Sequence, residues 1–316
     1  MTVQEKIDGL KAQTFGVEVE GNNITRQKAA QTAAAFFGTN NYAYTAGTDG
    51  YYTWSAWDQK GRKWKFQRDC SIHGPDDEKC ELVTPILEYA DLENFLELLR
   101  VLRKEGMKSC PARGCGVHIH VGLKGLDGRD HDARSLRNLA NMMAAHEEQI
   151  GRAIWIDKDR VDSYCKTVDP AFLERLNTEK PATMDGLKKV WYEGNHATYG
   201  QEQHYNNSRY HMLNLHASFT KGTVEFRLFQ FSNPHGDTKG GIHAGKMKAY
   251  IQLVLAMSNM AKMMKTARPE KPQIENEKYA MRTWLIRMGM IGAEFETARN
   301  HLVKNLAGNA AWRHAA

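Results

Sequence analysis

The sequence has few cysteines, and their spacing does not pair them. The five are Cys70, Cys80, Cys110, Cys115 and Cys165, an odd number without any Cys-x-x-Cys spacing. This usage argues against a disulfide framework and against a zinc ribbon. The first residues also lack the basic region followed by an apolar region that marks a secretory signal. We therefore expect a cytoplasmic protein with reduced thiols.

Long apolar runs are missing as well. The longest, Tyr250–Met264, is interrupted by Gln252, Ser258 and Lys262 and is too short to span a bilayer. It predicts a helix of the protein core, and no membrane partner is expected.

The charge is mildly basic and is not concentrated in one place. There are 43 basic and 37 acidic residues, a formal net charge of +6, and no basic stripe with interleaved aromatic residues. A nucleic-acid partner is therefore not expected. With 41% hydrophobic residues among 316, the chain can bury a large core. Nothing in the sequence predicts an oligomeric state.

The stretch Cys115–Leu123 places two histidines one residue apart within a run of β-branched residues. Successive side chains of a strand point to opposite faces, so His118 and His120 share one face and the apolar residues share the other. Taken alone, such a pair is more often an ordinary half-exposed strand than a site. The rest of the chain has to decide between the two.

Two other predicted strands have the same two-faced pattern. Glu18 and Glu20 alternate with valines near the start of the chain, and Glu225 and Arg227 alternate with apolar residues much later. Glutamate is depleted from strands, so three such strands together indicate a site. Carboxylates with few imidazoles suit magnesium or manganese better than zinc. An arginine adds a planar fork for a phosphate, and the combination indicates phosphoryl transfer.

Several short motifs between Phe15 and Phe231 resemble those of the amidoligase family, which is related to the glutamine synthetases and glutamate–cysteine ligases. The motifs are Phe15-Gly-Val-Glu-Val-Glu20, Asp69-Cys-Ser71, Glu81-Leu-Val-Thr-Pro85, Cys115-Gly-Val-His-Ile-His120, Arg209-Tyr210 with Leu213-Asn214, and Val224-Glu-Phe-Arg227. The resemblance implies an α+β fold with a glutamine synthetase-like curved antiparallel sheet, helices on its convex face and further helices at the C-terminus. The inner face of such a sheet holds ATP and magnesium or manganese ions.

The resemblance also implies roles for single residues. Glu18, His118 and Glu225 would hold a metal on the nucleotide phosphates, and Glu20 and Glu81 would bind a second metal near the substrate carboxylate. A further ligand beside Glu81 is expected, for which the sequence offers Glu78 or Glu88 only as guesses, so the number of metal ions stays open.

Four residues would serve the substrates. Arg227 would stabilise the transferring phosphate, while His120, Asp69 and Arg209 would line the substrate or nucleotide pocket. The implied reaction is ADP-forming: the γ-phosphate of ATP moves to a carboxylate, and an amine then attacks to form an amide. The substrates would be amino acids, amines or peptides, and the sequence does not identify the pair.

Two other functions fit parts of the pattern. His-x-His on a strand also occurs in metal-dependent amidohydrolase barrels, but on their first strand, whereas here an acidic strand comes first. A non-catalytic nucleotide-binding module is the second alternative, and the intact set of metal-binding residues argues for activity.

The periodicity of the chain predicts its organisation. Residues 1–13 form a lead-in, 14–265 the catalytic domain, 266–306 C-terminal helices packed on it, and 307–316 a tail. Within the domain, 157–210 is expected to be an irregular lid or insert, because proline and glycine punctuate it. The expected elements include a strand Cys80–Leu87, a helix Asp91–Lys104 capped by Asp91, and a hairpin of His211–Phe219 with Thr223–Phe231.

Overall fold

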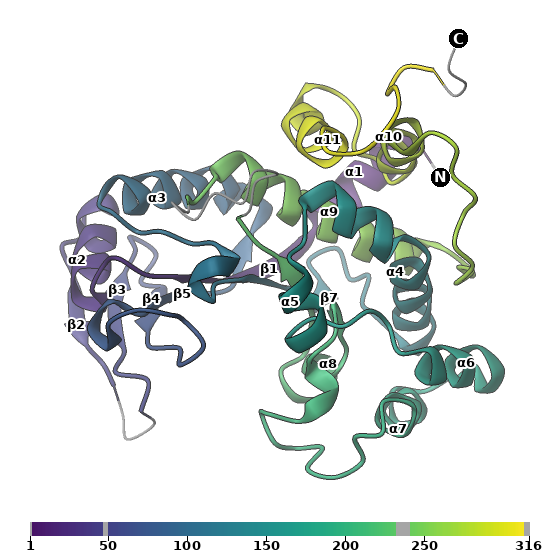
Figure 1. The fold of residues 1–316 in the computed structure, drawn as a ribbon, viewed down its shortest axis with the longest axis horizontal. Helices are drawn as coiled ribbons and strands as arrows, with labels where there is room; N and C mark the ends of the chain where they lie inside the picture. Colours follow the sequence, from purple (N-terminus) through teal and green to yellow (C-terminus); the bar gives the residue numbers. More distant parts are fainter. Residues whose placement is uncertain (1, 47–49, 232–240, 313–316) are drawn as a thin grey trace. The chain divides into compact units, whose positions relative to one another are not determined.

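The computed structural model describes residues 2–46, 50–231 and 241–312 (Figure 1). It is an α+β structure with antiparallel strand pairing, as predicted. The chain divides into two compact units. Unit 2 comprises Phe15–Ile119 and Phe229–Lys248; unit 1 comprises Met1–Thr14, His120–Leu228 and Ala249–Ala316. The domain boundaries expected at 14–265 and 266–306 stay predictions.

Unit 2 combines sheet strands with two long helices. Its strands follow the order β2-β3-β4-β5-β1-β7, and β6 pairs with β1. Helix α2 packs on β3, β4 and β5 and against α3 (Figure 1). The elements are β1 (Gln13–Gly21), α2 (Arg26–Phe36), β2 (Tyr42–Tyr44), β3 (Trp54–Trp57), β4 (Lys63–Gln67), η1 (Asp76–Glu78), β5 (Cys80–Val83), β6 (Leu87–Glu88), η2 (Tyr89–Asp91), α3 (Leu92–Lys104), η3 (Pro111–Arg113) and the first residues of β7 (Val117–Gly125).

The start of unit 2 follows the local sequence. Val17 and Val19 of β1 are buried, while Glu18 between them is partly exposed. The side chain of Thr25 accepts a hydrogen bond from the Lys28 amide and caps α2. Gly38, at a φ of +71°, follows the helix in the left-handed conformation that glycine tolerates. The predicted strand around Glu18 and Glu20 is therefore confirmed.

The strand expected over Cys80–Leu87 is shorter than predicted. β5 ends at Val83, and Pro85 separates it from the two-residue strand β6. A proline cannot donate to the sheet ladder, which explains the early end of β5.

Asp91 does not cap α3 with its side chain, which corrects the sequence prediction. Its carboxylate instead accepts hydrogen bonds from Arg62 at 2.6 and 3.1 Å and from Lys60 at 3.0 Å. Arg62 also donates to Asp58 at 2.8 Å. Burial raises the pKa of Asp91, but the bonds from Arg62, the Glu88 amide and Lys60 outweigh it and hold the pKa well below its usual range. This network ties the turn after β3 to the start of α3.

Unit 1 is mainly helical. Helix α4 packs against α6, α7 and α11, and α10 packs against α11. No helix among the described residues is both long and apolar enough to cross a membrane. The elements are α1 (Val3–Lys11), the remainder of β7, α4 (Ala133–Ile154), α5 (Lys158–Ser163), α6 (Pro170–Glu179), α7 (Met184–Gly194), η4 (Asn207–Arg209), β8 (Leu213–Asn214), α8 (His216–Thr220), β9 (Thr223–Phe229), α9 (Ala244–Met263, which begins in unit 2), α10 (Glu277–Arg287), η5 (Ala293–Phe295) and α11 (Glu296–Val303).

The segment 157–210 is not irregular, because it contains α5, α6 and α7. Proline does not interrupt α6: Pro170 follows the capping Asp169, at the position where a helix tolerates proline. Gly194 is the last residue of α7. A Cβ at this position would lie 2.5 Å from the Phe172 backbone, so glycine permits close packing of α7 on α6. Whether the segment acts as a lid stays a prediction.

The hairpin expected around residue 221 is only partly formed. Leu213 and Asn214 pair with Phe226 and Glu225 as β8 and β9, but residues 216–220 form the short helix α8. The side chain of Asn214 accepts a hydrogen bond from the His216 amide at 2.9 Å, which turns the chain out of the strand direction.

Candidate functional site

The histidine strand alternates as predicted. Val117, Ile119 and Val121 of β7 are fully buried, whereas His118 and His120 retain 5% and 9% of their exposure. β7 is one continuous strand whose first residues belong to unit 2 and whose later residues belong to unit 1. The surroundings of each histidine are therefore described within its own unit.

In unit 2, His118 lies among carboxylates. Its Nδ1 is 3.0 Å from Glu18 Oε2, and its Nε2 is 3.9 Å from Glu20 Oε1. Glu18, Glu81 and His118 each offer a ligand atom within 4.8 Å of the others. These three residues form what we call the histidine cluster.

A second group shares Glu81. Glu20 of β1 stands directly opposite Glu81 of β5 in the antiparallel register. The oxygens of Glu20, Asp69 and Glu81 lie within 4.8 Å of one another, and we call these residues the carboxylate cluster. Like charges opposite each other destabilise a sheet, so this arrangement needs a compensating cation or proton.

Glu81 is the residue of the carboxylate cluster whose pKa is raised by its surroundings. Burial raises its pKa well above the usual range, and the charges of Glu18, Glu20 and Asp69 raise it further. A hydrogen bond from Gln67 at 2.8 Å acts in the opposite direction. Glu81 therefore holds a proton more tightly than an ordinary glutamate, until a cation replaces that proton.

Asp69 is fixed by its own loop. Its Oδ1 accepts hydrogen bonds from the Ser71 amide at 2.7 Å and the Ser71 hydroxyl at 2.6 Å. The sequence predicts Asp69 in the substrate or nucleotide pocket and offers Glu78 or Glu88 as the further ligand beside Glu81. Among the described residues it is Asp69 that lies beside Glu81, and Glu88 is exposed.

The two clusters suit a magnesium or manganese ion. Most of their donor atoms are carboxylate oxygens, and the single imidazole is that of His118. Hard divalent cations prefer such oxygen-rich sets, whereas zinc sites more often recruit several histidines or cysteines. Two groups that meet at Glu81 could hold two ions or one ion in either place.

In unit 1, β9 carries a buried ion pair. Arg227 Nη1 donates to Glu225 Oε1 at 2.5 Å, and the two residues are only 4% and 2% exposed. Asn214, opposite Glu225 in the β8–β9 register, donates to Glu225 Oε2 at 2.6 Å. His120 Nδ1 lies 2.9 Å from the Thr223 hydroxyl and its Nε2 lies 3.8 Å from Glu225. Asn214 of β8 thus holds the carboxylate of the pair from the neighbouring strand.

A second arginine, Arg209, contacts the same tyrosine ring as Arg227. The Tyr210 ring is 5.7 Å from the Arg209 guanidinium and 5.9 Å from that of Arg227. Arg209 is 9% exposed and donates to the His204 carbonyl at 3.0 Å. Two guanidinium groups on one ring provide a cationic region that suits a phosphate or carboxylate.

Sequence reasoning missed two supporting residues. Gln67 orients Glu81 and lies opposite it in the β4–β5 register, while Thr223 orients His120. The alternation of β4 and β9 was the available signal, although it does not say which strands are neighbours. The predicted set of Glu18, His118 and Glu225 spans both units and stays a prediction.

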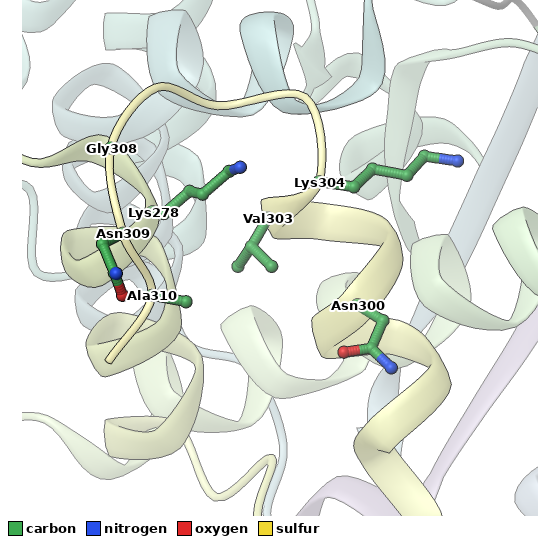
Figure 2. A pocket seen from close by; sticks show the side chains of 7 residues that line it. All are labelled: Lys278, Asn300, Val303, Lys304, Gly308, Asn309 and Ala310. Atoms are coloured by element: carbon green, nitrogen blue, oxygen red, sulfur yellow. The ribbon is translucent and has the colours of Figure 1, made fainter. Parts of the chain in front are cut away.

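One hollow lies well outside these motifs in the sequence. It measures about 460 Å³ and is formed by α10, α11 and residues 308–310 (Figure 2). Figure 2 shows Lys278 and Asn309 on one side of it and Val303 and Lys304 on the other. None of its lining residues is acidic, so it offers no carboxylate ligands for a metal.

Comparisons with known proteins give one family. No curated protein matches the chain. The solved structure of a bifunctional glutathione synthetase from Pasteurella multocida is similar with a TM-score of 0.45 and 13% identity, over 95% of this chain and 49% of that one. The chain therefore spans about half the length of that protein. A family model described as "Putative amidoligase enzyme" matches residues 11–258, which include every motif quoted above. The chain belongs to this amidoligase family.

Proposed function

We propose that the protein is an ATP-dependent, ADP-forming carboxylate–amine ligase that uses magnesium or manganese and acts on an amino acid, an amine or a peptide. The observation that supports this most is the pair of clusters meeting at Glu81, within the segment that matches the amidoligase family. A buried group of carboxylates with one imidazole provides what a metal–phosphate site needs. A glutamine synthetase-like curvature of the sheet belongs to the same proposal.

The carboxylates and the imidazole of the two clusters would bind the metal ions. Glu18, Glu81 and His118 would hold one divalent ion, and Glu20 with Asp69 would hold a second through the shared Glu81. The bound ions would neutralise phosphate charge. Asp69 is held by Ser71 and Glu81 by Gln67, so the ligand oxygens are fixed before an ion arrives.

The arginines would act on the phosphate that is transferred. The ion pair with Glu225 fixes the planar fork of Arg227, and Tyr210 lies beside both Arg227 and Arg209. A guanidinium that is already oriented stabilises developing charge without further reorganisation. His120, oriented by Thr223, would line the substrate pocket.

The chemistry needs two balanced steps. An oxygen of the substrate carboxylate takes the γ-phosphoryl group of ATP, and ADP leaves. The amine nitrogen then bonds to the acyl carbon, the phosphate departs with the former carboxylate oxygen, and the amine loses a proton. Phosphoryl transfer of this kind depends chiefly on position and charge.

The proposal predicts when ATP will be consumed. With ATP, magnesium and a pool of simple amines, the protein should release ADP and phosphate only when a carboxylate substrate, such as an amino acid or a peptide, is added. A coupled ADP assay measures this, and pools divided in successive rounds identify the pair. Cleavage of amides without ATP would favour the hydrolase instead, and nucleotide binding without turnover would favour a binding module.

A further inference from the structure

Unit 1 contains a second cavity, of about 520 Å³, which none of the motifs describes. It lies between the last turns of α4, the start of α5, the segment before α6 and the end of α11. Its volume falls within the usual range for small-molecule sites. Its walls combine an apolar surface with one buried acid.

The apolar wall is built from residues distant in the sequence. Ile156, Val161 and Met212 line it together with the ring of Trp155. Trp155 ends α4 in the left-handed conformation, at a φ of +57°, and keeps 44% of its exposure. A bulky residue rarely adopts this conformation, which costs free energy and often marks a functional position. The strained backbone places the indole at the cavity.

The acid of the cavity is Glu147, which is only 4% exposed. Its Oε2 accepts a hydrogen bond from the Val168 amide at 2.8 Å. Among the described residues, no Lys, Arg or His nitrogen lies within 4.0 Å of its carboxylate. The charged neighbours are occupied: Glu148 pairs with Lys271 at 2.5 Å, and Arg152 pairs with Glu277 at 2.6 Å. Arg152 also lines the cavity, but its ion pair is with Glu277, so Glu147 is a buried acid without an ion-pair partner among the described residues.

We propose that this cavity binds a small organic amine, with its ammonium group on Glu147 and its aromatic or branched aliphatic body against Trp155, Ile156, Val161 and Met212. A charged carboxylate with low exposure strongly favours an ammonium group over a neutral or anionic one. The adjacent indole adds cation–π and apolar contact. The site needs neither ATP nor a metal, so it goes beyond the ligase activity proposed above.

The cavity is connected by backbone hydrogen bonds to β9, the strand that carries Arg227, because Met212 lines the cavity. The Met212 amide donates to the Lys166 carbonyl at 2.7 Å, and the Met212 carbonyl accepts from the Arg227 amide at 2.9 Å. A ligand that packs on Met212 therefore contacts the backbone segment that is hydrogen-bonded to β9.

Ionisation of Glu147 gives the site a pH dependence. Burial raises the pKa of Glu147 to about 7, against smaller opposing effects of the Val168 amide and Lys271. The other charged groups nearby are Glu148, which pairs with Lys271, and the Arg152–Glu277 pair. An alkyl ammonium stays charged below about pH 9, so affinity should rise roughly tenfold between pH 6 and pH 8.

The test uses the full chain in EDTA without nucleotide, titrated with 2-phenylethylamine and followed by calorimetry or ligand-observed NMR. The amine should bind, with affinity rising with pH, and neutral 2-phenylethanol should bind at least tenfold more weakly. Glu147→Gln, which keeps an acceptor for the Val168 amide, should lower the affinity about tenfold and remove the pH dependence. Glu148→Gln is the matched control and should change the affinity less than threefold.

Trp155→Gly tests the wall separately. Glycine suits the positive φ at this position, so the fold should keep its thermal stability or gain some, while amine affinity falls several-fold. Equal binding of the alcohol and the amine, or unchanged affinity in Glu147→Gln, would overturn the proposal. Absence of amine binding would overturn it too, and would leave the ligase proposal untouched because that assay requires ATP and metal.

Discussion

Replacing Glu81 by glutamine is expected to abolish metal-dependent turnover while raising the thermal stability of the metal-free protein. Glu81 belongs to both the histidine cluster and the carboxylate cluster and faces Glu20 across the β1–β5 pairing. Glutamine keeps the shape and an acceptor for Gln67 but removes one buried charge. Loss of repulsion stabilises the fold, and loss of a shared ligand weakens metal binding by at least about 100-fold.

The sign of the pH dependence follows from the raised pKa of Glu81. Its usual value is near 4.5, and burial with the neighbouring acids raises it in the folded state. Between these two pKa values the folded state binds more protons than the unfolded state, so metal-free stability falls as pH rises through that window. Glu81→Gln should flatten this part of the profile. Thermal unfolding in EDTA between pH 4 and pH 8 measures both effects.

The matched control is Glu88→Gln, an exposed acid on β6. It should leave the unfolding temperature, its pH profile and manganese binding unchanged. A stabilising shift on adding manganese should appear in wild type and Glu88→Gln but not in Glu81→Gln. If Glu81→Gln lowers metal-free stability and retains activity per folded molecule, Glu81 is a structural residue.

Removing Arg227 is expected to have the second large effect. Arg227→Met leaves Glu225 buried without the guanidinium that now donates to it at 2.5 Å. Breaking a buried pair on one side costs about 3–5 kcal/mol of the free energy of unfolding. Activity should fall by about 1000-fold or more if Arg227 stabilises the transferring phosphate. Denaturant unfolding and steady-state ATP turnover measure the two losses.

Two further variants separate stability from chemistry. Replacing both partners by apolar residues, Arg227→Met with Glu225→Leu, should recover most of the stability and none of the activity. Arg227→Lys keeps the positive charge but loses the planar fork, so it should be more stable than Arg227→Met and still poorly active. Recovery of turnover in the double variant would show that the pair only supports the fold.

Much of the site could be predicted because side chains alternate between the two faces of a strand. Glu18 and His118 each lie on the polar face of their strand, and their side chains are 3.0 Å apart in the structure. Strand pairing could not be predicted in the same way. That Gln67 and Glu20 both flank Glu81 depends on the β4–β5 and β1–β5 registers, which the local sequence does not encode.

The predictions of local structure are wrong where the same residue type is compatible with two structural roles. A proline at position 170 indicates a break in a helix, but directly after Asp169 it begins α6. The position of Asp91 predicts a helix cap, but its carboxylate accepts hydrogen bonds from Arg62 of the preceding hairpin. The Glu147 cavity has no sequence pattern at all, since tertiary packing brings Met212 beside it. Local patterns gave the elements, and long-range packing decided these assignments.

The most direct test of the ligase proposal follows one oxygen atom. Substrates found in the ADP assay are supplied with ¹⁸O in the carboxylate, and the released phosphate is analysed by mass spectrometry. Formation of the amide through a phosphorylated carboxylate predicts one ¹⁸O atom in each phosphate released. Unlabelled phosphate released in step with amide formation would contradict the account.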